Sequence, residues 1–274
     1  MARHLLAWEI PLMLQTVPGI LSRIAEHKRA ELAARAWDVA ALEREAEARA
    51  ADRRGFARAL RARRPAIIAE AKKASPSKGV LHAEYDAAEI AEMYARGGAA
   101  AMSVLTDERF FQGSLADLRA ARGRTPVPVL RKDFTIDERH VLEAAAAGAD
   151  AILLIAALLT TDEMRRFREL AARFGVDALV EVHDGEELAR ALDSGAEIVG
   201  VNNRDLNTFE VRLETSIQLA ARIPKSLVRV SESGVHSAAD VRLLMGAGYQ
   251  AFLVGEHLMK AEDPVESLRA LTCS

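Results

Sequence analysis

Residues 148–155 read Gly-Ala-Asp-Ala-Ile-Leu-Leu-Ile, and this pattern occurs four more times along the chain. In each copy a glycine follows a helix-like segment, and two or three small or polar residues lead into an apolar run. Such a glycine is typical of the left-handed position that ends a helix, where a Cβ atom is costly. An uninterrupted apolar run predicts a strand buried on both faces, as in a parallel sheet. The other copies begin at Gly98, Gly175, Gly195 and Gly248.

Three further apolar runs, at residues 66–72, 128–132 and 227–232, bring the predicted number of strands to eight. Amphipathic segments separate the strands, and two of them begin with cap-like pairs, at residues 160–163 and 184–187. Eight strands that alternate with helices over about 200 residues predict an α/β fold, a (β/α)8 TIM barrel. A doubly wound open sheet is the alternative, but no Gly-x-Gly-x-x-Gly follows the first strand.

Two additional helices are expected before the first strand. They cover about residues 20–37 and 42–60, with Gly55 as a candidate break in the second. No linker or low-complexity tract divides the chain. We therefore expect one structural domain, in which residues 1–64 form an N-terminal arm and helices packed on a catalytic barrel of residues 65–274.

The first residues of the chain make a poor signal peptide. The apolar stretch at residues 5–14 is interrupted by Glu9 and Pro11, and no other segment reaches ~18 uninterrupted apolar residues. We expect an arm that packs on the domain and no membrane span. Translation from Met13 is an alternative that the sequence leaves open.

The composition limits the partners and the setting. A net charge of −3 and a pI near 6.2 argue against nucleic-acid binding carried by bulk charge. The single cysteine, Cys273, excludes an intrachain disulfide and a cysteine-based metal site. A reducing, cytoplasmic setting fits this composition.

Charged side chains occur at the ends of several predicted strands. In a barrel these ends meet at one mouth, where enzymes of this fold have their active sites. Lysines close to carboxylates shift each other's pKa, which is typical of proton-transfer sites. A structural ion pair is the alternative for any single residue, but it explains the whole ring less well. The ring consists of Glu70, Lys72, Lys132, Glu181 and Glu232.

Glu70 and Lys72 lie two residues apart on the first predicted strand, so their side chains share one face. An acid and a base on a buried strand are costly unless they are paired or used. His183 and His236 are weaker candidates, and we expect His183 to be a solvated loop histidine. No histidine or carboxylate spacing predicts a metal site.

Two glycine-containing loops predict a phosphate site. Ser233-Gly234 follows the seventh predicted strand and Gly255-Glu256 follows the eighth. Backbone N–H groups and a helix N-terminus can face an anion at these positions. Ser75, in the loop after the first strand, offers a further hydroxyl. The predicted ligand is a phosphorylated small molecule.

Five motifs at these strand ends together resemble the indole-3-glycerol-phosphate synthase family, over about residues 20–259. The resemblance implies a TIM barrel with additional N-terminal helices and no metal or organic cofactor. It also implies a carbon–carbon lyase (carboxy-lyase, decarboxylase) of tryptophan, or aromatic amino-acid, biosynthesis. The implied reaction is ring closure, decarboxylation and dehydration of 1-(2-carboxyphenylamino)-1-deoxyribulose 5-phosphate to indole-3-glycerol phosphate. The motifs are Glu70-x-Lys72-x-x-Ser75-Pro76-Ser77, Leu130-Arg131-Lys132-Asp133-Phe134, Leu179-Val180-Glu181-Val182-His183, Gly200-Val201-Asn202-Asn203-Arg204-Asp205-Leu206 and Ser231-Glu232-Ser233-Gly234.

The resemblance also implies residue roles. Lys132 is the proton donor to the carbonyl oxygen at ring closure. Glu70 as base and Lys72 as acid serve the dehydration. Glu181 orients or stabilises cationic intermediates, with a proton relay as an alternative. The division of protons among Glu70, Lys72 and Glu181 stays open.

The remaining positions carried over from the family surround the substrate. The further catalytic or network residues are Asn202, Glu232 and Ser233, and Arg204 binds substrate. The aromatic ring is enclosed by Phe111, Phe134, Leu153 and Leu206, for which simple core packing is the alternative. The phosphate contacts are Ser75, Gly234, Gly255 and the backbone N–H of Glu256. His257 stands where the family often has serine, so a hydroxyl contact is lost there.

Two rival functions differ in class. A phosphoribosylanthranilate or histidine-pathway isomerase would use Cys/Asp or paired Asp catalysts, whereas this chain presents Glu and Lys. A non-catalytic barrel is disfavoured because every catalytic position that can be matched is filled. We expect a monomer or weak homo-oligomer.

Overall fold

The computed structural model describes residues 19–76, 78–82 and 84–272, and within them eight parallel strands close into a barrel. The order around the barrel is β1-β10-β9-β8-β7-β6-β5-β4. The predicted (β/α)8 barrel is therefore confirmed, and the open sheet is wrong. The strands are β1 (Ala66–Ala71), β4 (Ala101–Leu105), β5 (Val129–Lys132), β6 (Ala151–Ile155), β7 (Asp177–Val182), β8 (Ile198–Asn202), β9 (Val228–Glu232) and β10 (Ala251–Val254).

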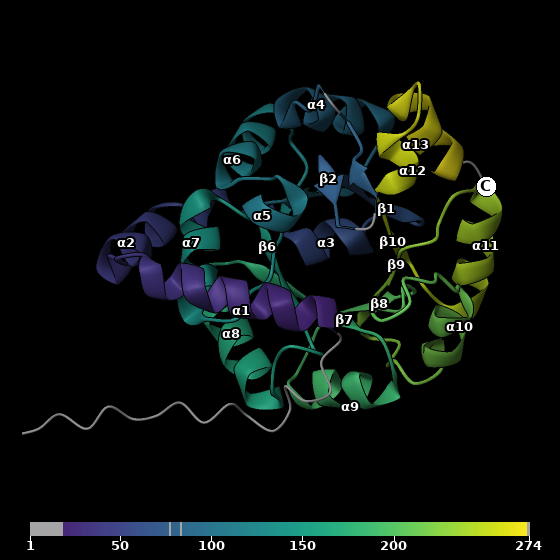
Figure 1. Ribbon diagram of the computed structural model, residues 1–274. Helices are drawn as coiled ribbons and strands as arrows, with labels where there is room; N and C mark the ends of the chain where they lie inside the picture. The colour runs from purple at the N-terminus through teal and green to yellow at the C-terminus, as the bar shows by residue number, and fades with distance from the viewer. Residues whose placement is uncertain (1–18, 77, 83, 273–274) are drawn as a thin grey trace, which may run out of the picture.

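Helices form a ring around this barrel (Figure 1). None of the helices within the described ranges is long and apolar enough to cross a membrane. The ring consists of α4 (Ala87–Gly97), α6 (Leu115–Arg124), α7 (Glu138–Ala147), α8 (Thr161–Arg173), α9 (Gly185–Asp193), α10 (Glu214–Ala220), α11 (Ala238–Ala247) and α13 (Pro264–Thr272). Short elements at the strand ends are α5 (Glu108–Phe111), α12 (Glu256–Met259) and a hairpin of β2 (Ala74–Ser75) and β3 (Gly79–Val80), which the sequence pattern did not predict.

The repeated glycines end helices as the pattern predicts. All five have φ between +68° and +109°, a region that a Cβ atom disfavours. Thr160 and Glu163 form a reciprocal capping box at the start of α8. Asp184 caps α9, but the Glu187 side chain does not complete a box there and instead accepts hydrogen bonds from His183.

The additional helices are also present: α1 (Gly19–Ala34), α2 (Val39–Ala48), the 3-10 turn η2 (Ala50–Asp52) and α3 (Phe56–Arg61). Gly55, at φ +71°, separates η2 from α3, as expected. The predicted arm at residues 1–18 lies outside the described residues, as does Cys273.

Two of these helices cover opposite ends of the barrel. Phe56 and Leu60 of α3 are fully buried in the cluster of side chains that fills the barrel interior. The Ala57 N–H donates to Asp177, the first residue of β7, so α3 lies at the amino ends of the strands. Leu21 and Ile24 of α1 join the same interior cluster. Helix α1 lies across one end of the barrel in Figure 1.

A buried lysine ties α1 to two loops at the other end. Lys28 Nζ lies 3.0 Å from a carboxylate oxygen of Asp107, after β4, and 3.0 Å from one of Asp133, after β5. Asp107 accepts the N–H of Phe110, and Asp133 accepts the N–H of Phe134. Burial of Lys28 opposes its charge, but these two carboxylates raise its pKa above the usual range. Lys28 therefore couples the N-terminal helix to two aromatic loops.

We predict that Lys28→Met destabilises the fold by about 3 kcal/mol, because it leaves buried carboxylates without their shared cation. Urea unfolding followed by circular dichroism measures this loss. Arg29→Met is the matched control: it removes the neighbouring, exposed positive charge from the same helix and should change stability by less than about 0.5 kcal/mol. Equal losses in the two variants would contradict the proposed role of the buried contact.

Candidate active site

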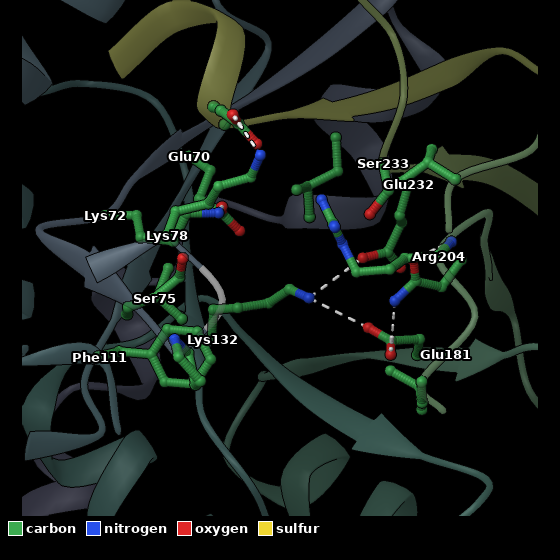
Figure 2. Close-up of a pocket in the computed structure, with 18 of the residues that line it drawn as sticks. Glu70, Lys72, Ser75, Lys78, Phe111, Lys132, Glu181, Arg204, Glu232 and Ser233 are labelled. Atoms are coloured by element: carbon green, nitrogen blue, oxygen red, sulfur yellow. Dashed lines mark hydrogen bonds and ion pairs between the residues drawn. The ribbon is translucent and has the colours of Figure 1, made fainter. Parts of the chain in front are cut away.

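A pocket of about 450 Å³ opens at the carboxyl ends of the strands. Its lining contains all the catalytic, substrate and phosphate residues that the family resemblance implies, and Figure 2 shows several of them around the pocket. The fold thus brings together three groups from distant parts of the chain: the charged ring, the apolar enclosure and the phosphate loops. Helix α1, for which the sequence predicts no role in a site, also contributes Ile20, Leu21 and Ile24 to the lining, and the loop residue Lys78 lies there too.

Lys132, at the end of β5, reaches across the pocket to two carboxylates from other strands (Figure 2). Its Nζ lies 3.0 Å from Glu181 Oε2 and 3.2 Å from Glu232 Oε2. Burial disfavours the ammonium, but the two carboxylates raise the pKa of Lys132 above its usual range. Lys132 is therefore positively charged at neutral pH.

The two partners of Lys132 differ in protonation. Burial would raise the pKa of Glu181, but Lys132 and two further donors lower it below the usual range. Burial raises the pKa of Glu232, the charge of Glu181 adds to the rise, and Lys132 only partly offsets it. Glu181 is thus an ionised carboxylate, and Glu232 is the one that can hold a proton near neutral pH.

Glu70 and Lys72 form a second ion pair on β1 and the residue following it. Lys72 Nζ donates to Glu70 Oε1 at 2.6 Å. Burial would raise the pKa of Glu70, but the charges of Lys72 and Lys132 lower it. The site therefore holds two lysine–carboxylate groups whose charges interact across one pocket. This arrangement is suited to two separate proton-transfer steps.

Two glycines make room for the buried carboxylates. A Cβ atom at Gly200, on β8, would lie 2.0 Å from Glu232 Oε1, and one at Gly255 would lie 2.3 Å from Glu70 Oε1. No side chain larger than hydrogen fits at either position while the carboxylates stay in place. From the sequence, Gly255 is expected in phosphate binding and Gly200 at an ordinary strand position, because neither contact is local in sequence.

An apolar wall lies beside the charged groups. The rings of Phe111 and Phe134 pack with centroids 6.0 Å apart. Leu153 and Leu206 line the same pocket, together with the α1 side chains. Phe134 is the residue whose N–H Asp133 holds, so this wall is fixed by the Lys28 contacts.

The predicted phosphate loops line the same pocket. Ser233 and Gly234 both have left-handed backbone, with φ of +66° and +84°. They lead into α11, which begins with a capping box formed by Ser237 and Asp240. Ser75, Gly255 and Glu256 line the same pocket. Lys260 Nζ donates to the Glu256 side chain at 2.6 Å. The group of Glu256 that can bind an anion is therefore its backbone N–H.

His183 is not the solvated loop histidine that the sequence analysis expects, and that prediction is wrong. Only 13% of its side chain is exposed. Its ring lies between Glu181 and Glu187, at ion-pair distances of 3.3 and 2.9 Å. Burial alone would lower the pKa of His183, but these carboxylates raise it to about 10. The signal available in the sequence was Glu187, four residues later.

Within the three described ranges, no group of three His, Cys, Asp or Glu side chains is arranged to hold a metal ion.

Comparison with known sequences gives one consistent family. The family model described as "Indole-3-glycerol phosphate synthase" matches residues 21–271. A protein of Koribacter versatilis (strain Ellin345) named "Indole-3-glycerol phosphate synthase" is 49% identical over 256 residues. That match covers 92% of this chain and 98% of the relative.

Comparison with solved structures supports the fold alone. The crystal structure of KGPDC from Streptococcus mutans has a TM-score of 0.57 at 14% identity, covering 76% of this chain and 96% of that one. A thiamine phosphate pyrophosphorylase from Pyrococcus furiosus has a TM-score of 0.56 at 18% identity, covering 76% and 93%.

We predict that Gly200→Ala lowers kcat by about 10²-fold, because a misplacement of about 1 Å in a reacting group has an effect of this size. The added methyl group displaces the Glu232 carboxylate without changing any charge. Steady-state turnover measures the loss, and thermal unfolding checks that the variant is folded. Gly246→Ala in α11, where a Cβ atom meets nothing within 4 Å, is the matched control and should keep wild-type turnover. Wild-type turnover in both variants would show that Gly200 does not position Glu232.

Proposed function

The chain belongs to the indole-3-glycerol phosphate synthase family, and we propose how its residues divide that family's reaction. The reaction is a step of tryptophan biosynthesis catalysed by a carboxy-lyase. Ring closure, decarboxylation and dehydration convert 1-(2-carboxyphenylamino)-1-deoxyribulose 5-phosphate to indole-3-glycerol phosphate.

The proposed division rests on Lys132, which lies between two buried carboxylates in the pocket. During ring closure, electron density moves onto the C2 carbonyl oxygen, which then needs a proton. Lys132 is the donor, since its raised pKa keeps it charged and an alkoxide is a far stronger base than its amine. Glu232, which can hold a proton near neutral pH, returns one to Lys132.

Glu181 stabilises positive charge in this scheme. The ring-closed intermediate carries a cationic nitrogen until CO₂ leaves. An ionised carboxylate in a buried pocket stabilises such a cation more strongly than it would in water. Glu181 has a lowered pKa and keeps its charge, and Asn202 Nδ2 donates to its Oε1 at 3.1 Å. Asn202 therefore helps to orient this carboxylate.

Glu70 and Lys72 carry out the dehydration. Loss of water needs an acid for the departing hydroxyl group and a base for the ring proton. Lys72 is the acid and Glu70 is the base, and their 2.6 Å contact lets the proton return from one to the other after turnover. The second lysine–carboxylate group thus serves the second proton-transfer step, the dehydration.

The remaining pocket residues hold the two ends of the substrate. Phe111, Phe134, Leu153 and Leu206 enclose the aromatic ring, and Arg204 binds substrate at the rim. The phosphate is held by Ser75, by Ser233-Gly234 and by Gly255-Glu256, with backbone N–H groups as the main donors. The phosphorylated small molecule is the partner that this pocket supports.

The setting and assembly are also proposals. A single cysteine supports a reducing, cytoplasmic setting, and we propose a monomer or weak homo-oligomer. The burial of α1 and α3 side chains in the barrel interior supports one structural domain made of residues 19–64 and the barrel of residues 65–274.

The direct test of the function is product formation. Purified protein is incubated with the carboxyphenylamino-deoxyribulose phosphate, and indole fluorescence is followed with time. We expect indole fluorescence to rise. The amount of CO₂ released should equal the amount of indole product formed. Folded protein that forms neither product would contradict the function.

The two lysines should block different steps. Lys132→Met stops ring closure, so CO₂ release and indole formation both fall, by about 10²-fold or more. Lys72→Met stops dehydration, so CO₂ is released in a single turnover while indole formation falls by a similar factor. Lys225→Met, an exposed lysine outside the pocket, is the control and should leave both signals unchanged. Loss of both signals in Lys72→Met, or of neither in Lys132→Met, would overturn this assignment.

A further inference from the structure

His183 is held on two sides by carboxylates at the edge of the active site. Glu187 Oε2, on α9, accepts both the backbone N–H of His183, at 2.8 Å, and its ring Nδ1, at 2.9 Å. Two donors from one residue on one carboxylate oxygen fix the orientation of the imidazole ring. The other ring nitrogen, Nε2, lies 3.3 Å from Glu181 Oε1.

This geometry favours the imidazolium form. With Nδ1 donating to Glu187, a neutral ring would turn the lone pair of Nε2 toward the carboxylate of Glu181. An ionised carboxylate has only acceptor sites, so that contact would repel. A proton on Nε2 makes both contacts attractive: Nδ1 donates a charge-assisted hydrogen bond to Glu187, and Nε2 forms an ion pair with Glu181.

The charges around the ring agree with this form. Glu181 faces His183 from β7 and Glu187 from α9, and Asp205 adds negative charge from the loop after β8. Lys132 is the opposing positive charge, on the far oxygen of Glu181. Burial lowers the pKa of His183, but the carboxylates raise it to about 10.

Glu181 therefore has a different partner set on each oxygen. Its Oε2 contacts Lys132, while its Oε1 contacts Asn202 and His183. A carboxylate held at only one oxygen can rotate about its terminal bond. The contacts at Oε1 remove that freedom and keep Oε2 directed at Lys132.

We propose that His183 is a positioning residue of this enzyme: an imidazolium, clamped by Glu187, that orients Glu181 toward Lys132 and the substrate. The inference rests on the role proposed above for Glu181. It adds Glu187, which lines no part of the pocket, to the groups on which turnover depends.

Glu187→Gln is the informative change, because it keeps an oxygen that accepts both His183 hydrogen bonds and removes only the charge. In the native protein the folded pKa of His183 lies above the ordinary value of about 6.5. Its stabilising charge is thus fully present below that value and lost only as the pH rises through about 10. Without the Glu187 charge the folded pKa falls toward neutrality, and the loss moves into the range in which activity is measured.

The experiment measures kcat of Glu187→Gln relative to the native enzyme as a function of pH, with the ¹⁵N chemical shifts of the His183 ring recorded in parallel. We expect His183 to stay protonated through about pH 9 in the native enzyme and to titrate at lower pH in the variant. The relative kcat should fall about tenfold along the same titration, because the ion pair that orients Glu181 is lost, with KM changing less. Glu186→Gln removes an exposed charge from the same turn of α9 and should match the native enzyme throughout.

Two outcomes would overturn the inference alone. A neutral His183 ring in the native enzyme at about pH 7 would show that His183 is not an imidazolium. If His183 titrates in Glu187→Gln and kcat does not change along that titration, His183 does not position Glu181. Glu181→Gln separates these from failure of the proposed function: if it keeps native kcat while the His183 titration is as expected, Glu181 has no role and the inference falls with it.

Discussion

The proposed active site depends on the burial of Lys132 with its carboxylates. Glu181 and Glu232 are both almost fully buried, and an isolated carboxylate in such a place is strongly disfavoured. Lys132 makes their burial tolerable, and they in turn keep Lys132 charged. The three groups come from β5, β7 and β9, so the contact exists only when the barrel is closed. The stability of the charged cluster and its chemistry therefore depend on the same geometry.

Burial of this cluster needs room on one side and enclosure on the other. Gly200 and Gly255 supply the room, since a methyl group at either would overlap a carboxylate oxygen. Helix α1 supplies part of the enclosure, and Lys28 fixes the loops that carry Phe110 and Phe134 beneath it. An N-terminal helix added to a barrel thus becomes one wall of the pocket. Removing water from this pocket strengthens each electrostatic contact inside it.

Much of this could be predicted from sequence because the signals are local. A glycine at a helix end and an apolar run after it report on their own backbone, and the positions of charged residues after such runs follow from barrel geometry. The sequence pattern fails where the direction of a side chain, or a contact between two strands, decides the surroundings of a residue. His183 follows a strand tip like a loop residue, and only folding shows that its ring turns back between Glu181 and Glu187. Gly200 reads as a weak strand position until Glu232, from the next strand along the chain, is seen beside it. The prediction of a helix over about residues 20–37 does not reveal that one of its faces meets a pocket.

The central claim is that Lys132, rather than Lys72, faces the carbonyl oxygen at ring closure. A crystal structure with a substrate analogue whose C2 carbonyl is reduced to an alcohol tests this directly, since the analogue cannot close its ring. We expect Lys132 Nζ within about 3 Å of the C2 oxygen, with Glu181 Oε2 still bound to Lys132 and Lys72 still on Glu70. A complex in which Lys72 contacts the C2 oxygen, while Lys132 keeps only its two carboxylates, would contradict this division of the site.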